Sequence, residues 1–154
     1  GEYLSIYAAI QEGWEDTVFK LFEVLSQIGY GKKITVGKGQ FKILDISEFN
    51  DFGKVENPNS FITLSNYVPK KDDPTRGQYK ILVKYGKLGN EYALSKNPFK
   101  KPLIMIQPGA VFWDDEPKYT YGRLVKNISD YNDGVVQCGC TLTIPARITL
   151  PAGI

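Results

Sequence analysis

Two kinds of periodicity organise the apolar residues near the start of this chain. Residues 2–10 alternate, so that Leu4, Ile6 and Ile10 fall on one side, which is the repeat of an extended strand. Residues 14–28 follow the repeat of an amphipathic helix, whose apolar face consists of Trp14, Val18, Leu21, Phe22, Leu25 and Ile28. Gly29 stands where a glycine commonly ends a helix. We therefore predict a strand over residues 2–10 and a helix over residues 14–28 that stops at Gly29.

The rest of the chain has the pattern of strands separated by polar or turn-forming residues. The strands are expected at residues 40–46, 61–68, 79–85, 103–106, 122–128 and 135–144. The apolar side of the last strand is expected to carry Val136, Cys138, Cys140, Leu142 and Ile144. One helix and about seven strands predict an α+β fold, and the opening strand–helix–loop–strand unit is typical of a ferredoxin-like domain with β-hairpin additions.

Residues 29–41 join the predicted helix to the next strand through four glycines and three lysines, with no acidic residue. Glycine lets backbone amides approach a ligand closely, and lysines beside such amides suit phosphate groups. The spacing fits neither a P-loop nor a dinucleotide-binding fingerprint, because Lys32 and Ile34 stand where these motifs require glycine. An extended polyanion such as a nucleic-acid backbone is the predicted ligand, and a solvated connector is the alternative. The candidate RNA-binding residues of this glycine loop are Gly29, Gly31, Lys32, Lys33, Thr35, Gly37, Lys38, Gly39 and Gln40.

Composition narrows the possible functions. The chain has 154 residues, a formal net charge of +2 and no histidine. A charge this small means that any nucleic-acid site is local, and the lack of histidine removes the commonest general base and metal ligand. No run of about 18 apolar residues is present, so we predict no membrane span and expect a cytoplasmic protein.

The two cysteines also limit the chemistry. Cys138 and Cys140 are expected about 7 Å apart on one side of a strand, which exceeds the reach of a disulfide bond. Two thiols without histidine are too few ligands for a zinc site. We therefore predict reduced, buried cysteines, no metal site and no cofactor.

Three blocks of sequence carry a resemblance to a known family. They comprise the helix with the glycine loop up to residues 37–41, then residues 61–69 with 79–81, and finally residues 100–112 with 121–125. With these blocks, in this order, the chain resembles the C-terminal part of a RAMP subunit of type III-A CRISPR effector complexes. That subunit, the fourth of the Csm complex, holds the 5′ tag of the crRNA. The resemblance covers most of residues 14–145.

The resemblance implies a fold and a function. Residues 1–154 would form a single C-terminal RAMP domain, ferredoxin-like and similar to an RNA-recognition (RRM-like) fold, and the family's N-terminal half would be absent from this chain. The function implied is not enzymatic. The subunit would hold the crRNA 5′ tag in an antiviral ribonucleoprotein, dock on the large polymerase-like subunit and adjoin the backbone RAMP subunit.

Two other functions stay open at this point. A related RAMP endoribonuclease would cut repeat RNA, and without histidine its acid and base would have to be Tyr30 with Lys32 or Lys33. A purely structural protein-interaction domain would bind no RNA at all.

Overall fold

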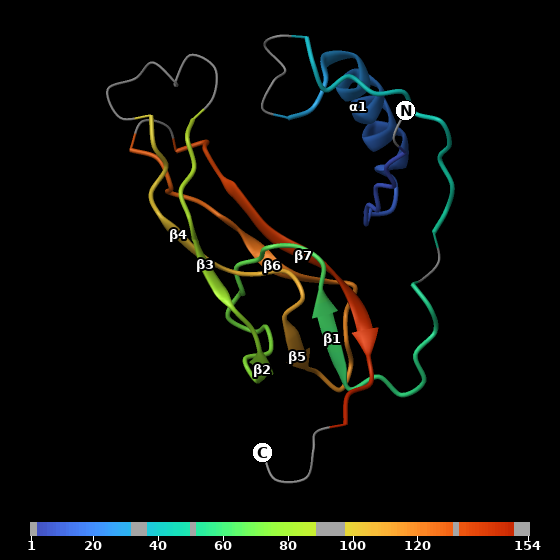
Figure 1. The fold of residues 1–154 in the computed structure, drawn as a ribbon, viewed down its shortest axis with the longest axis vertical. Helices are drawn as coiled ribbons and strands as arrows, with labels where there is room; N and C mark the ends of the chain where they lie inside the picture. Colours follow the sequence, from blue (N-terminus) through green and yellow to red (C-terminus); the bar gives the residue numbers. More distant parts are fainter. Residues whose placement is uncertain (1–2, 32–36, 50–51, 89–97, 131–132, 150–154) are drawn as a thin grey trace. The chain divides into compact units, whose positions relative to one another are not determined.

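The structure is a computed structural model that describes residues 3–31, 37–49, 52–88, 98–130 and 133–149. It divides into two compact units, Gly1–Asp51 and Phe52–Ile154, which we call the N-terminal unit and the C-terminal unit. The helix belongs to the first and the strands to the second (Figure 1).

The N-terminal unit contains helix α1, Glu15–Ile28, as predicted. Glu15 and Asp16 in its first turn complement the positive end of the helix dipole. Gly29 ends the helix with a φ of 97°, which is costly for any residue with a Cβ, and its N–H donates to the Leu25 carbonyl at 2.7 Å. The predicted helix and its stop at Gly29 are therefore confirmed.

The strands predicted on either side of this helix do not form. Residues 3–10 and 40–46 carry no strand. Alternation shows how side chains would distribute on a strand, but a strand also needs a partner that accepts its hydrogen bonds. These segments make isolated contacts within the N-terminal unit instead: the Phe41 N–H donates to the Ser26 carbonyl at 3.3 Å, and the Tyr7 and Phe49 rings meet edge to face at 4.8 Å.

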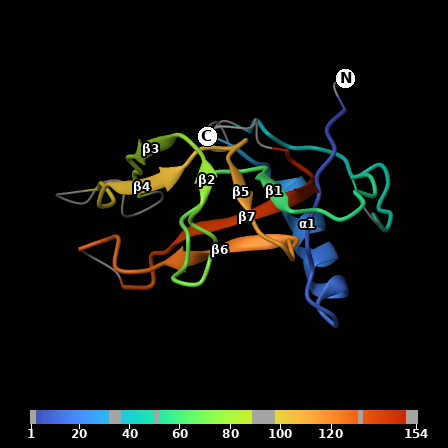
Figure 2. The ribbon, with the colours of Figure 1, turned by 90° about the horizontal axis from the view of Figure 1, so that it is seen from below.

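The C-terminal unit contains seven described strands in two antiparallel sheets (Figure 2). Their bounds are Ser60–Thr63 (β1), Gly77–Gln78 (β2), Ile81–Lys84 (β3), Leu103–Ile106 (β4), Val111–Trp113 (β5), Thr120–Val125 (β6) and Gln137–Ala146 (β7). The larger sheet has the order β2-β5-β1-β7-β6, and β3 pairs with β4 in the smaller one. One helix with antiparallel sheets confirms the α+β prediction.

Most predicted strands are present with shifted bounds, and residues 61–68 show why a bound moves. These residues form two pieces rather than one strand. The first piece, β1, lies between β5 and β7 in the larger sheet. The chain then bends at Leu64 and Ser65, and Tyr67 forms a two-way backbone bridge with Ile106 of β4, with hydrogen bonds of 3.1 and 2.8 Å. This single apolar run therefore makes backbone hydrogen bonds to both sheets.

Two hydrophobic clusters form the core of the C-terminal unit. The first consists of Phe61, Tyr67, Ile106, Ala110, Phe112 and Tyr121, and the second of Val68, Met105, Val125 and Ile128. In the first cluster the Phe61 ring stacks on Tyr121 with centroids 3.9 Å apart and on Phe112 at 5.7 Å. The first cluster contains Phe61 of β1 and Ile106 of β4, so burial of these side chains joins the two sheets.

The face of β7 that is buried is the opposite of the predicted one. Gly139, Thr141 and Thr143 are buried, whereas Cys138 and Cys140 are exposed free thiols. The prediction of buried cysteines is therefore wrong, and both thiols are free in this structure.

Hydrogen bonds and close packing explain this choice of face. Thr141 Oγ1 accepts from the Ser65 N–H at 3.1 Å and donates to the Leu142 carbonyl at 2.8 Å, and Thr143 Oγ1 donates to the Lys118 carbonyl. Burial of a hydroxyl costs little once its hydrogen bonds are made. Val68 packs so closely over Gly139 that a Cβ there would lie 2.9 Å from the Val68 Cβ. The buried side of β7 therefore has no room for a cysteine side chain at residue 139.

Candidate nucleic-acid interface

The glycine loop is the site that the sequence predicts. Lys32, Lys33 and Thr35 lie outside the residues that the structure describes. The described members follow the end of α1: Gly29, Gly31, Gly37, Lys38, Gly39 and Gln40. The four glycines have φ values of 97°, 110°, 71° and 90°, a conformation that residues with a Cβ rarely adopt.

Two of these glycines are required by the loop itself. The Tyr30 N–H donates to the Gly39 carbonyl at 2.9 Å, which brings the two limbs of the loop together. A Cβ at Gly39 would lie 2.1 Å from the Tyr30 carbonyl oxygen, and one at Gly29 would lie 3.0 Å from the Lys38 carbonyl oxygen. Gly29 and Gly39 therefore allow close contact between two parts of the backbone.

Gln40 also has a structural contact. Its side-chain Nε2 donates to the Gln27 carbonyl at 2.8 Å, which satisfies one of the carbonyls left unpaired at the end of α1. The sequence identified these residues as unusual, but their described contacts are internal to the N-terminal unit.

Gly31, Gly37 and Lys38 are the described loop residues that remain available to a ligand. All three are exposed, and a Cβ at Gly31 or Gly37 would meet nothing within 4 Å. Open backbone next to a lysine is suited to a phosphate group. Among the described residues of the predicted site, these three are therefore the ones still placed to contact a phosphate group.

A strongly basic segment lies in the C-terminal unit, and the sequence prediction missed it. Residues 76–113 contain one acidic residue, Glu91, and seven basic ones: Arg76, Lys80, Lys84, Lys87, Lys96, Lys100 and Lys101. The segment therefore carries a formal charge of +6 in a chain whose total is +2, so the remainder carries −4. A count of charge in windows along the sequence would have found it.

The structure gives this basic segment a shape. It includes β3 and β4, whose register pairs Val83 with Ile104. Ile81, Val83 and Ile104 lie on one side of this two-stranded sheet and are exposed. Leu82, Leu103 and Met105 lie on the other side and belong to the second hydrophobic cluster or pack against it. We call the exposed side the outer face of the β3–β4 hairpin.

The groups with shifted pKa values do not form a catalytic cleft. Burial raises the pKa of Tyr67 and of Tyr121, and in Tyr121 the hydrogen bond to Asp114 raises the pKa further. Both phenols therefore keep their protons at neutral pH and are poor bases, and both belong to the first hydrophobic cluster. Among the described residues, no group of three histidine, cysteine, aspartate or glutamate side chains is placed to hold a metal ion.

No protein-family model matches this chain, and no curated protein matches its sequence. In the described part of the chain, no helix combines the length and the apolar character that crossing a membrane requires.

Proposed function

We propose that this chain is a non-catalytic RNA-holding subunit of a type III-A CRISPR ribonucleoprotein. In this proposal it is the C-terminal, ferredoxin-like RAMP domain of the tag-binding subunit and acts in the cytoplasm. Its partners would be the crRNA 5′ tag, the large polymerase-like subunit and the backbone RAMP subunit. The observation that carries the proposal is the ordered resemblance of the three sequence blocks between residues 14 and 145.

The glycine loop supports the proposal chemically. Gly31, Gly37 and Lys38 are exposed at the end of α1, and Lys32 and Lys33 lie between them in the sequence. Each lysine that neutralises a phosphate of a single strand steepens the dependence of log affinity on log salt by about 0.7. Three such lysines would contribute a slope of about −2.

Fluorescence anisotropy with a labelled RNA that carries the repeat-derived tag tests the proposal. The full chain is titrated at several salt concentrations, beside a variant with Lys32→Ala, Lys33→Ala and Lys38→Ala. The triple variant is expected to bind more weakly and to flatten the salt slope by about 2. A matched control replaces Lys20, Lys54 and Lys118, which are exposed and belong to neither candidate surface, by alanine.

Two results would replace this proposal with another. Cleavage of repeat RNA by the purified chain without metal would identify an endoribonuclease. Lack of any salt-dependent RNA binding by the chain and by its complex would identify a protein-interaction domain.

A further inference from the structure

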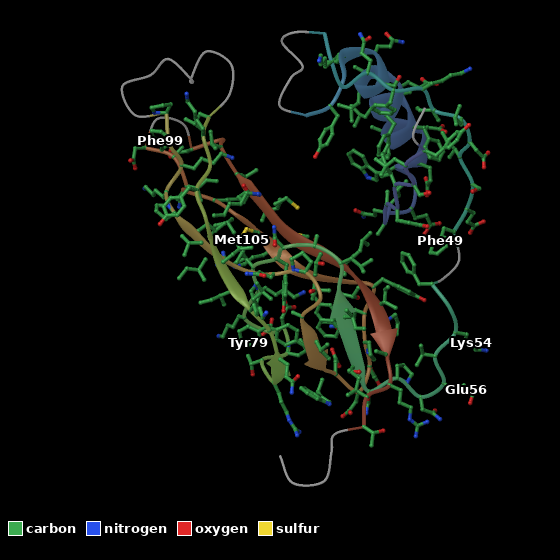
Figure 3. All side chains as sticks on the ribbon, in the orientation of Figure 1. Phe49, Lys54, Glu56, Tyr79, Phe99 and Met105 are labelled. Carbon is green, nitrogen blue, oxygen red and sulfur yellow. The ribbon has the colours of Figure 1, made fainter. Side chains whose placement is uncertain are left out.

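The outer face of the hairpin exposes an unusual amount of apolar surface. Ile81 is 59% exposed, Ile104 63% and Tyr85 75%. The exposed apolar residues along it are Tyr79, Ile81, Val83, Tyr85, Phe99 and Ile104. Phe99 reaches this side because it forms a bridge with Lys87, which alternates with Tyr85 and Val83 along the strand. In Figure 3 the labelled Tyr79 and Phe99 lie near opposite ends of the hairpin.

A stack of aromatic rings leads from the core to this face. The Tyr121 ring stacks on Phe61, Phe61 on Phe112, and Phe112 on Tyr79, whose centroid lies 5.4 Å from that of Phe112. The three interplanar angles are 10°, 23° and 16°, so the rings are close to parallel. Tyr79 ends the stack and is 50% exposed. Packing on Phe112 thus fixes the orientation of a ring that still offers surface to a planar ligand.

The charge around this face suits an anion. Lys87 is exposed just after β3 and lies on the outer face with Tyr85 and Val83, whereas Lys80 precedes β3 and points to the other side. No described residue from 76 to 113 carries a carboxylate side chain. Lys101 is less available to an anionic ligand, because its Nζ lies 2.9 Å from a carboxylate oxygen of Asp130. Protein–protein interfaces are depleted in lysine, whereas sites for single-stranded nucleic acid combine exposed aromatic rings with lysine.

We infer that the outer face of the β3–β4 hairpin binds single-stranded RNA, with bases stacked on Tyr79 and Tyr85 and phosphates beside Lys87. The inference rests on the proposed RNA-holding function and adds a second contact surface to it. A single strand is specified because its bases are free to stack on side chains, whereas those of a duplex already stack on each other. The apolar residues between the rings cover the base edges that face the sheet.

Tyr85 provides the sharpest test, because it is largely exposed and its replacement does not disturb the aromatic core. The full chain is titrated with a labelled uridine oligonucleotide of about 12 nucleotides, a length in the range that single-strand binders cover. Tyr85→Ala is expected to weaken binding about 5- to 150-fold, the effect of losing one stacked base. Tyr85→Phe keeps the ring and is expected to bind like the parent chain. Tyr119→Ala is the matched control, since Tyr119 is 64% exposed and lies outside the hairpin.

Lys87 gives an independent readout. Replacing Lys87 by alanine is expected to flatten the salt slope by about 0.7, the contribution of one phosphate contact of a single strand. Crosslinking with thiouridine-substituted RNA is expected to label peptides that contain Tyr79 or Tyr85. The thermal midpoint of each variant, read by circular dichroism, is expected to match that of the parent chain.

The outcomes separate this inference from the proposed function. If the glycine-loop triple variant loses RNA affinity while Tyr85→Ala and Lys87→Ala do not, the hairpin inference fails and the proposed function stands. If the hairpin variants weaken binding and the loop variant does not, the inference stands and the predicted loop site fails. If Tyr85→Ala releases a co-purifying protein but leaves RNA affinity unchanged, the face is a protein-docking surface and the inference is overturned.

Discussion

The two units of this chain use apolar residues in opposite ways. In the N-terminal unit, α1 has a well-formed apolar face but no buried side chain, and Leu21 is 62% exposed. In the C-terminal unit, Phe61 is completely buried and Phe112 nearly so, and stacked rings surround them. The difference shows that helical periodicity was enough to predict α1, whereas burial requires a second layer to pack against.

The largest effect should come from cutting the aromatic stack. Phe61→Ala removes a fully buried ring and is expected to lower the free energy of unfolding of the C-terminal unit by about 3–5 kcal/mol. Leu21→Ala in α1 is expected to change stability by no more than about 0.5 kcal/mol, because its side chain is already exposed. The chain has one tryptophan in each unit, Trp14 and Trp113, so variants with a single tryptophan report each unit separately in urea denaturation. A loss of several kcal/mol in Leu21→Ala would show that α1 is packed after all.

Glycine-to-alanine substitutions compare the two units in another way, because they separate backbone strain from close packing. Gly122 has a φ of +96°, and a Cβ there would lie 2.1 Å from the Gly139 carbonyl oxygen on the paired strand. Gly122→Ala is therefore expected to cost about 2–4 kcal/mol, from backbone strain together with the clash. Gly37→Ala and Gly109→Ala carry similar strain but meet nothing within 4 Å, and each is expected to cost about 1 kcal/mol. Equal losses in all three variants, measured by urea denaturation, would mean that strain alone sets the cost.

Alkaline pH should destabilise the C-terminal unit. Burial raises the pKa of Tyr67 and of Tyr121, so the folded state holds their protons more tightly than the unfolded state does. The stability that this provides is complete below about pH 10, the ordinary tyrosine pKa, and is lost as the pH rises above it. Each tyrosine is expected to contribute a loss of up to about 1.4 kcal/mol per pH unit. Urea denaturation at pH 8 and pH 11, with Trp113 fluorescence as the readout, measures the loss. A Tyr67→Phe variant that loses stability as steeply as the parent chain would contradict this origin.

The two buried phenols should respond differently to loss of their hydroxyl groups. The Tyr121 hydroxyl donates to Asp114 at 2.6 Å and accepts from the Lys118 N–H at 2.9 Å, so Tyr121→Phe is expected to cost about 1–2 kcal/mol at neutral pH. Tyr67 Oη is buried without a hydrogen-bond partner among the described residues, so Tyr67→Phe is expected to be neutral or slightly stabilising. Thermal denaturation of the two variants side by side tests this, and a destabilised Tyr67→Phe would reveal a partner.

The smallest effect should come from the cysteines. Cys138 and Cys140 are exposed, so replacing both by serine is expected to change the free energy of unfolding by no more than about 0.5 kcal/mol in total. Both thiols are expected to react with Ellman's reagent in the folded protein. Although Cys140 is exposed, partial burial desolvates its thiol and raises the pKa of Cys140. Its reaction is therefore expected to speed up at a higher pH than that of a fully solvated cysteine. Failure of both thiols to react before denaturation would restore the buried face that the sequence predicted.

Local features of this fold were predictable from the sequence, and features that depend on distant partners were not. Helix α1 and its end at Gly29 follow from spacing within a few residues, and β4 was predicted with its observed bounds, Leu103–Ile106. The face of β7 depends on Ser65 and Lys118, which supply hydrogen bonds to its threonines, and on Val68, which leaves no room for a Cβ at Gly139. None of these contacts is visible in the alternation of the strand.

The candidate sites, too, were predictable from the sequence only in their local features. Glycines at 29 and 39 were correctly singled out as unusual, but the chain uses them to bring Tyr30 and Lys38 close to the opposite limb of the loop. The basic hairpin has a clear local signal in the sequence, a net charge of +6 over residues 76–113. The exposure of only one side of β3 and the ring stack that ends at Tyr79 required the structure, because Phe112 lies on another strand.

The position of β1 between β5 and β7 also determines when this protein can finish folding. The Ser60 hydroxyl donates to the Ala146 carbonyl, a partner 86 residues later in the chain. At a synthesis rate of about 5–20 residues per second, β1 waits roughly 4–17 s for that partner to be made. During this interval the side of β1 that pairs with β7 stays open even after β5 has been made, so Phe61 and Ile62 form part of an incompletely paired apolar strand. Such a segment is the kind that nascent-chain chaperones shield. The high contact order that makes the finished sheet continuous is therefore expected to make refolding slow, on a timescale of milliseconds to seconds.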